Sequence, residues 1–184
     1  MTAEQPTSTV IVERRQRFVF PAGWRAWKQD ETTFYRKRFQ SLPSNPESVD
    51  IVAINPDGCC WLIEIKDYRV GTLDLPQISD WCKMLSGKVC GTLACLITAA
   101  CRPEKTEIDI QNAQAAIAAS RFRIVLQVEL PRPNGRGRKR AHEFALRKHS
   151  EDISRRLKAL CGPAEVRSSS LPSSSPIRWQ VEDV

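Results

Sequence analysis

Hydrophobic positions form two runs, interrupted by the charges of Asp50, Glu64 and Lys66, in Ser48–Arg69, the stretch SVDIVAINPDGCCWLIEIKDYR. Two apolar runs there flank Asn55–Gly58, an Asn-Pro-Asp-Gly sequence typical of a type I turn closed by a glycine in the left-handed region. We therefore expect a β-hairpin whose register is set by this turn. The expected cross-strand pairs are Asn55–Cys59, Ile54–Cys60, Val52–Leu62 and Asp50–Glu64.

The pattern around the hairpin predicts both strands and helices. Before it we expect a β-like run at Thr9–Phe20, a short helix at Trp24–Glu31, a strand at Thr32–Gln40 and a loop at Ser41–Ser48. After it we expect a helix from Asp74 or Leu75 to Gly87, a buried helix or strand at Val89–Ala100, a helix at Lys105–Ser120 and a strand at Phe122–Leu130. This mixed order predicts an α/β domain with a mixed sheet.

The last third of the chain begins with a basic loop at Pro131–Arg140, PRPNGRGRKR. A helix is expected at Ala141–Leu160, ended by Gly162 and Pro163. Its predicted inward residues are Phe144, Ile153, Leu157 and Leu160.

We expect one domain over residues 1–162 and a flexible tail over residues 163–184. Ser168–Pro176 is a serine- and proline-rich linker of the kind that stays disordered. The final IRWQVEDV either docks back or stays loose, and Trp179 suggests docking on the domain itself or on a partner.

Composition adds a preference for polyanionic partners. The chain has 28 Lys and Arg against 21 Asp and Glu, a formal net charge of +7, which favours nucleic acid first and an anionic membrane surface second. Solubility alone is the alternative explanation.

The N-terminus has no signal-peptide pattern, and the apolar run Val89–Cys101 is too short to span a bilayer, so we expect a cytoplasmic protein with no membrane association. Its seven cysteines have no CxxC spacing. Six of them are expected to be reduced and buried: Cys59, Cys60, Cys82, Cys90, Cys95 and Cys101.

The candidate chemistry lies in the hairpin. Asp50, Glu64 and Lys66 fall on one face, because side chains alternate along a strand. Two carboxylates directly across from each other repel, and a divalent cation between them removes the repulsion, since Mg²⁺ prefers oxygen ligands. The alternative is a solvated polar face with an ordinary Glu64–Lys66 surface pair.

These residues resemble a known signature. Asp50 followed by Glu64-Ile65-Lys66 is similar to the motif of the PD-(D/E)xK phosphodiesterase superfamily, and Gln77 to Trp81 resembles the Q-h-x-x-Y helix motif of its RecB-like members, with Trp81 in place of tyrosine. The chain departs from the family pattern before Asp50, where Val49 replaces the usual proline. Glu31 is the best match for the acid often found on the first helix.

The resemblance implies a restriction-endonuclease-like core, with a central mixed sheet flanked by helices, and a role for each residue. Asp50, Glu64 and the Ile65 carbonyl are expected to bind Mg²⁺ or Mn²⁺, while Lys66 positions or deprotonates the attacking water and stabilises developing charge. Gln77 is expected to orient the site or touch the phosphate. A polar residue in the first turn of a helix is the alternative for Gln77.

The basic loop offers a second contact with nucleic acid. Its Arg136, Arg138, Lys139 and Arg140 suit the phosphate backbone without reading sequence, although a solvated loop is the alternative.

The leading hypothesis is a metal-dependent nuclease acting on DNA, with RNA possible. The second is a catalytically inactive nuclease-like subunit that binds DNA or serves as a scaffold, with a protein partner or a second copy. The third is a basic interaction protein without a site.

Overall fold

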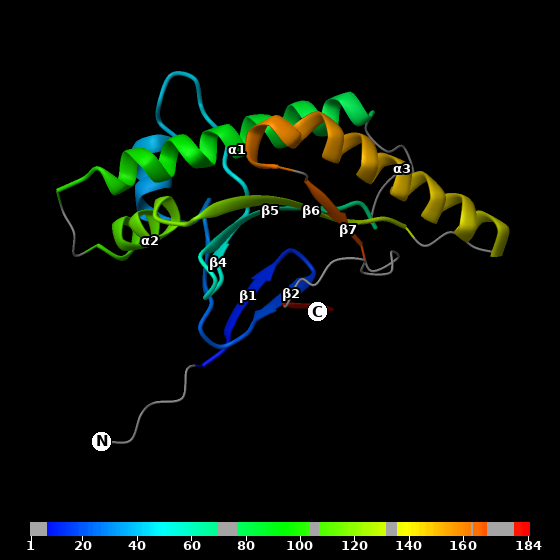
Figure 1. Ribbon diagram of the computed structural model, residues 1–184, viewed down its shortest axis with the longest axis horizontal. Helices are drawn as coiled ribbons and strands as arrows, with labels where there is room; N and C mark the ends of the chain where they lie inside the picture. The colour runs from blue at the N-terminus through cyan, green and yellow to red at the C-terminus, as the bar shows by residue number, and fades with distance from the viewer. Residues whose placement is uncertain (1–6, 70–76, 104–106, 132–135, 163, 169–178) are drawn as a thin grey trace.

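The computed structural model describes residues 7–69, 77–103, 107–131, 136–162, 164–168 and 179–184. A five-stranded mixed sheet lies at its centre, with helices on one face and a three-stranded sheet on the other (Figure 1). The expected α/β fold, with a mixed sheet flanked by helices, is confirmed.

The central sheet has the order β3-β4-β5-β6-β7. Its strands are β3 (Arg25–Lys28), β4 (Ile51–Ile54), β5 (Cys59–Asp67), β6 (Arg121–Glu129) and β7 (Glu165–Arg167). β3, β4 and β5 are antiparallel neighbours, whereas β6 pairs parallel with β5 and β7 parallel with β6. A parallel pair needs a crossover connection, and helices supply both crossovers here.

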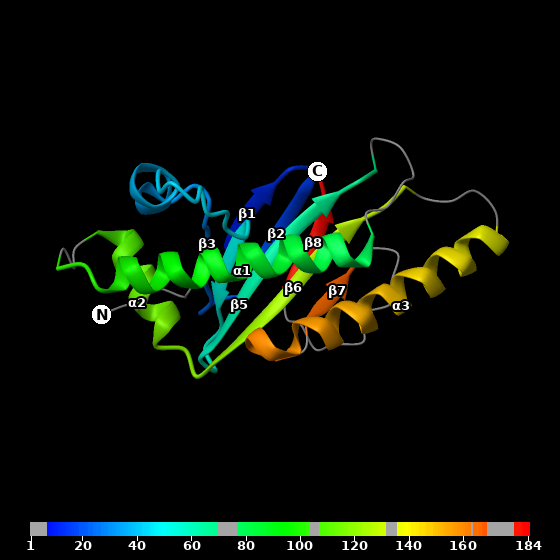
Figure 2. The ribbon, with the colours of Figure 1, turned by 90° about the horizontal axis from the view of Figure 1, so that it is seen from above.

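The helices lie over one face of this sheet. They are α1 (Ile78–Ala100), α2 (Ile108–Ile117) and α3 (Arg136–Cys161), and a short π-helical turn, η1 (Tyr35–Phe39), packs into the same core. Figure 2 shows α1 crossing the strands, with α3 beside it. The opposite face is covered by β1 (Thr9–Glu13), β2 (Gln16–Phe20) and β8 (Gln180–Asp183), which form an antiparallel sheet.

The hairpin β4–β5 has the predicted turn and register. Gly58 has φ 71° and donates its N–H to the Asn55 carbonyl at 3.0 Å, while Asn55 Oδ1 accepts from the Cys59 N–H at 2.8 Å. Ile54 is paired with Cys60 and Val52 with Leu62, as expected. The turn therefore fixes which β5 side chains face the helices.

Two expected elements before the hairpin are wrong. The predicted helix at Trp24–Glu31 contains β3, because its backbone pairs with β4 at the sheet edge. The predicted strand at Thr32–Gln40 contains η1, whose buried Tyr35 and Phe39 lie on one side four residues apart. Aromatic residues fit a strand or a helical turn equally well, and the local pattern does not distinguish them.

The β-like run Thr9–Phe20 folds back on itself. It forms the hairpin β1–β2, which reverses at Arg14 with φ 55°. Side chains alternate in the same way along one long strand and along two short paired strands. The hydrophobic pattern of Thr9–Phe20 therefore does not reveal the turn at Arg14.

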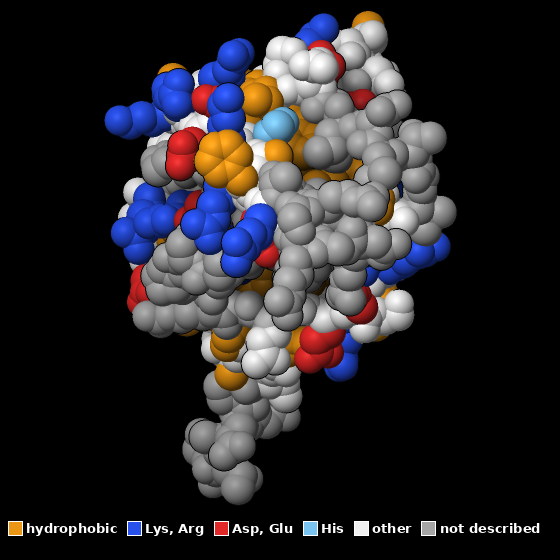
Figure 3. Space-filling model, turned by 90° about the vertical axis from the view of Figure 1, so that its right-hand side faces the viewer, with side chains coloured by type: hydrophobic (Ala, Val, Ile, Leu, Met, Phe, Trp, Pro, Cys, Tyr) orange, Lys and Arg blue, Asp and Glu red, His pale blue; other side chains and the backbone are white. Residues whose placement is uncertain are grey.

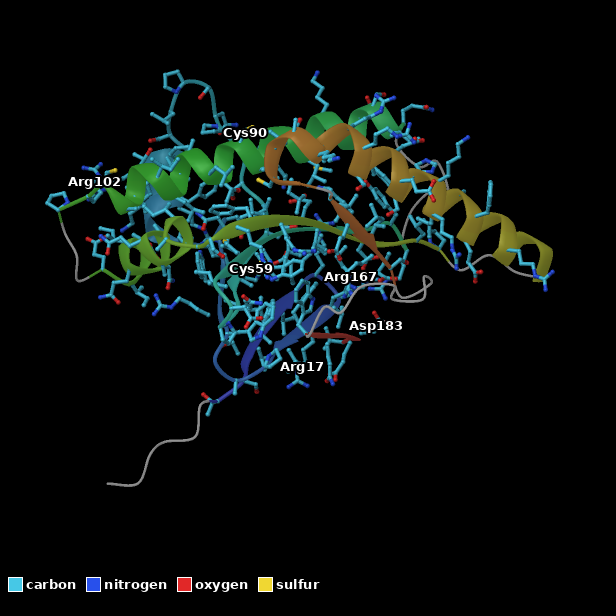
Figure 4. All side chains as sticks on the ribbon, in the orientation of Figure 1. Arg17, Cys59, Cys90, Arg102, Arg167 and Asp183 are labelled. Carbon is cyan, nitrogen blue, oxygen red and sulfur yellow. The ribbon has the colours of Figure 1, made fainter. Side chains whose placement is uncertain are left out.

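Helix α1 does not stop at Gly87 but continues to Ala100, so the ambiguous run Val89–Ala100 is helical. The expected start at Asp74 or Leu75 lies outside the described residues. Cys90 and Cys101 are exposed rather than buried (Figure 4 labels Cys90 on the outer side of α1), while the other expected core cysteines are buried. This is the one helix among the described residues that is long and apolar enough to cross a membrane, and 44% of its apolar window is buried inside the fold.

Helix α3 begins five residues earlier than expected. Arg136, Arg138, Lys139 and Arg140 therefore lie in its first turns and not in a loop. Ile153 and Leu157 are buried as predicted, but Phe144 and Leu160 are 71% and 38% exposed. Leu146 takes the inward position instead, since it lies seven residues, or two turns, before Ile153.

The C-terminal residues are part of both sheets, contrary to the expected flexible tail. β7 extends the central sheet and β8 pairs with β2. Trp179 is 5% exposed and meets Phe20, Trp24 and Trp61 at ring-centroid distances of 5.6, 5.7 and 5.3 Å. Figure 4 shows Arg167 and Asp183 on the side of the three-stranded sheet, where the Arg167 guanidinium lies 5.6 Å from the Trp179 ring. The expected linker Ser168–Pro176 lies almost entirely outside the described residues.

The contact of α1 with the segment before β4 leads to a prediction about stability. A Cβ on Gly91 would lie 2.1 Å from the Glu47 carbonyl oxygen, whereas a Cβ on Gly87 would meet nothing within 4 Å. We expect Gly91→Ala to lower the free energy of unfolding by at least about 1–3 kcal/mol through overpacking. Gly87→Ala, the matched control, should raise it by about 0.5–1 kcal/mol because alanine favours the helix. Urea denaturation measures both, and equal effects would contradict the close approach.

Candidate functional site

The hairpin and α1 bring the predicted acids together under the helix layer. Asp50 comes directly before β4, and Glu64 and Lys66 lie on the face of β5 that carries Leu62 toward the helices. Asp50 is 8% exposed and Glu64 has no exposed surface. The face is therefore buried, and the expected alternative of a solvated polar face is wrong.

Two ammonium groups compensate the charge of Glu64. Lys66 Nζ and Lys88 Nζ each lie 2.9 Å from Glu64 Oε1, and their side chains are 20% and 14% exposed. Lys66 comes from β5 itself, and Lys88 reaches down from the middle of α1. Glu64 Oε2 is buried and has no hydrogen-bond partner among the described residues.

Asp50 is held by the backbone of the neighbouring strand. Its Oδ2 accepts a hydrogen bond from the Ile65 N–H at 2.6 Å. Burial, and then the charge of Glu64, raise the pKa of Asp50 to about 6, while the Ile65 hydrogen bond and the Lys88 charge act in the opposite direction. The Glu64 charge therefore acts on the pKa of Asp50 across the strand pair, in agreement with the predicted register.

Helix α1 also fixes the segment that carries Asp50. The Val49 N–H donates to Thr92 Oγ1 at 2.9 Å, and Gly91 lets the Glu47 carbonyl approach the helix. Lys88 lies one turn before Thr92 on the same side of α1. One helix face thus positions both the acid-bearing segment and the lysine that pairs with Glu64.

A further acid lies near Asp50, one residue before the predicted Glu31. Burial, and then the charge of Asp50, raise the pKa of Asp30. Glu31 is instead on the surface, with its carboxylate 2.9 Å from Lys28 Nζ and 3.9 Å from Arg36. Glu31 therefore does not join the cluster.

The remaining predicted site residues are not gathered at the carboxylates. Gln77 is exposed at the start of α1, eleven residues or about 16 Å along the helix axis from Lys88. Arg140 is exposed on α3. The side chains of Arg136, Arg138 and Lys139 lie outside the part of the chain that the structure describes in detail.

The donors for a metal ion are incomplete within the described residues, where no group of three or more His, Cys, Asp or Glu side chains is placed to hold one. Asp50 and Glu64 supply carboxylate oxygens, and the unpartnered Glu64 Oε2 is the type of atom that a hard cation binds. Two acids and a backbone carbonyl such as that of Ile65 fit Mg²⁺ or Mn²⁺, which keep several waters as ligands.

Lys88 is the residue that sequence reasoning missed. The expected helix ended at Gly87, so Lys88 fell between two elements. The signal was present, because Lys88 lies three residues after Leu85 and four before Thr92, on the buried stripe of α1. A lysine on the apolar stripe of a helix indicates a buried carboxylate partner, because an unpaired buried ammonium is costly. In this structure the partner is Glu64.

Comparison with protein-family models, curated proteins and solved structures gives no significant match for this chain.

The double ion pair predicts a large effect of removing Lys88. Lys88→Met should lower the free energy of unfolding by up to about 3–5 kcal/mol, because it leaves a buried carboxylate with one partner fewer. Lys83→Met, on the exposed side of α1, should change it by no more than about 0.5 kcal/mol. The double variant Glu64→Gln/Lys88→Met should recover much of the stability that Lys88→Met loses, because the buried charge is removed together with its partner. Equal stabilities of the two single variants would refute the pairing.

The raised pKa of Asp50 predicts a pH dependence of stability in metal-free buffer. Because the folded-state pKa of about 6 lies above the ordinary value, ionised Asp50 destabilises the fold above pH 6, and this penalty disappears as the pH falls toward 4. Asp50→Asn should therefore be more stable than wild type at pH 7, by on the order of 2 kcal/mol, and lose this advantage at pH 4. Asp57→Asn, in the exposed turn, serves as the control. Denaturant unfolding at both pH values tests this, and a constant difference would contradict it.

Proposed function

We propose that this protein hydrolyses phosphodiester bonds of DNA in a metal-dependent reaction, with RNA as a possible substrate. The observation that carries the proposal is the convergence of Asp50, Glu64 and Lys66 on one buried face of the β4–β5 hairpin. The formal net charge of +7 supports a polyanionic substrate.

The arrangement of elements supports a restriction-endonuclease-like core. The resemblance expects a short helix, a strand, the acid-bearing hairpin and then a helix, and the chain has β3, β4–β5 and α1 in the order of the last three. The strand after the helices, β6, returns parallel beside β5. The first helix expected of the family is represented here only by the short turn η1, which follows β3.

Each residue has a role that follows from its position. Asp50, Glu64 and the Ile65 carbonyl would hold Mg²⁺ or Mn²⁺, which supplies Lewis-acid polarisation of the phosphate and an acidified water. Lys66 is the most exposed member of the cluster, so its ammonium is the group best placed to meet a phosphate or orient the attacking water. Lys88 balances the buried charge of Glu64 and keeps its carboxylate facing α1.

The second candidate function has an observation in its favour. Glu64 has no exposed surface and is contacted by two ammonium groups, so two acids and two lysines balance without any metal ion. Such a cluster suits a nuclease-like module that binds DNA or acts as a scaffold without cleaving it. This second candidate would act together with a protein partner or a second copy of the chain. For both candidates we propose a cytoplasmic location without membrane association.

The test is cleavage of supercoiled plasmid and of circular single-stranded DNA with Mg²⁺ or Mn²⁺. Wild type should nick or degrade DNA, and Lys66→Ala should reduce the rate by at least about 100-fold, the loss typical of a group that stabilises transition-state charge. Lys83→Ala, which removes an exposed lysine of α1, should retain full activity.

Metal titration separates the two candidates. Chelation with EDTA should abolish cleavage and leave DNA binding intact if the protein is a nuclease. DNA binding without cleavage in either metal, with Lys66→Ala equal to wild type, would establish the inactive module.

A further inference from the structure

The outer face of α3 carries an exposed aromatic ring within a field of positive charge. Phe144 is 71% exposed, the highest value among the large hydrophobic residues of the described chain and the only aromatic one among those exposed. It lies on the side of α3 opposite Leu146 and Ile153, which are buried. No packing requirement of the fold explains an aromatic residue at this position.

Basic side chains flank the ring at helical spacing. Arg140 lies four residues before Phe144, and Arg147 and Lys148 lie three and four residues after it, so all three are its neighbours on the helix surface. Arg155 lies two turns after Lys148 on the same face and is paired with Asp152 at 3.1 Å. Two acids, Glu143 and Glu151, lie beside these basic residues at helical spacing. On the face shown in Figure 3, Lys and Arg side chains gather around exposed hydrophobic ones.

The inner side of α3 contacts α1 and the end of β5 through aromatic rings. The His149 ring, on α3, lies 5.7 Å from the Trp81 ring of α1, and Trp81 stacks on Tyr68 at 6.4 Å. Tyr68 follows Lys66 by two residues, on the same side of the chain.

An exposed aromatic ring between cations is the combination that binds single-stranded nucleic acid. The ring stacks on an unpaired base, while the cations contact the phosphates on either side without reading sequence. A duplex keeps its bases stacked internally and offers an exposed ring nothing to stack on.

We propose that the face of α3 formed by Arg140, Phe144, Arg147 and Lys148 binds single-stranded nucleic acid, with Phe144 stacking on a base. The inference rests on the proposed function for its substrate class, phosphodiester polymers, and adds the strand form and the contact surface. It requires binding alone, so it can hold whether or not the protein cleaves.

The test measures binding of a fluorescent 20-nucleotide dT oligonucleotide and of a 20-base-pair duplex in EDTA, where no metal-dependent cleavage occurs. Phe144→Ala should weaken oligonucleotide binding about 10-fold, within the range of one base–aromatic stack, and leave duplex binding within about 2-fold. Its salt dependence should not change. Arg147→Gln/Lys148→Gln should instead reduce the magnitude of the slope of log K against log salt by about 1.4 units, since each of the two lost phosphate contacts contributes about 0.7.

Matched variants decide what the ring does. Phe144→Trp should retain binding, whereas Phe144→Leu, which keeps apolar surface but has no ring, should bind like Phe144→Ala. Leu160→Ala, at another exposed apolar position on α3, should bind like wild type. Circular dichroism confirms that each variant is folded.

Any of three results would overturn the proposal. The first is that Phe144→Leu binds the oligonucleotide as tightly as wild type does. The second is that Phe144→Ala loses the same affinity for oligonucleotide and duplex, and the third is that Phe144→Ala loses affinity only for vesicles that contain phosphatidylserine. The last result would assign the face to an anionic membrane surface. If the protein does not cleave DNA but still binds the oligonucleotide through Phe144, the proposed nuclease activity is rejected and the proposed binding face is retained.

Discussion

A carboxylate with no exposed surface requires positive charge at contact distance. Glu64 obtains it from its own strand, β5, and from the helix that covers it, α1. Lys66 comes from its own strand and Lys88 from α1, each 2.9 Å from the same oxygen. Removing either ammonium group would leave Glu64 with one partner fewer in a low-dielectric interior, which costs several kcal/mol. The double ion pair therefore links the hairpin to α1 and sets the position of that helix over the sheet.

The rest of the helix layer follows from this link. Gly91 and Thr92 lie one turn beyond Lys88 and receive the segment before β4, so Asp50 is held next to Glu64 by the same helix face. Two acids and two lysines then form an electrically balanced cluster. Balance explains how the fold keeps two neighbouring carboxylates in its interior.

The two surfaces of chemical interest have opposite character. The carboxylate cluster is buried and depends on tertiary contacts, whereas the basic face of α3 is exposed and depends only on helical spacing. The rings of Tyr68, Trp81 and His149 join the inner side of α3 to α1 and to the end of β5, on the helix-covered face of the central sheet. The opposite side is closed by β8 and Trp179, which fill the apolar space between the two sheets.

The hairpin was predictable from the chain alone, because Asn55–Gly58 has local turn chemistry that fixes the register, and with it the meeting of Asp50 and Glu64. The strand β6 was also predictable, from the largely apolar run Phe122–Leu130. Three features depend on tertiary contacts instead: the strand at Arg25–Lys28, the continuation of α1 through Gly87, and the pairing of Lys88 with Glu64. These outcomes depend on partners far along the chain: the edge of β4, the carbonyl of Glu47 and a buried carboxylate. A local pattern contains the turn that makes a hairpin, but not the distant residue that compensates a buried charge.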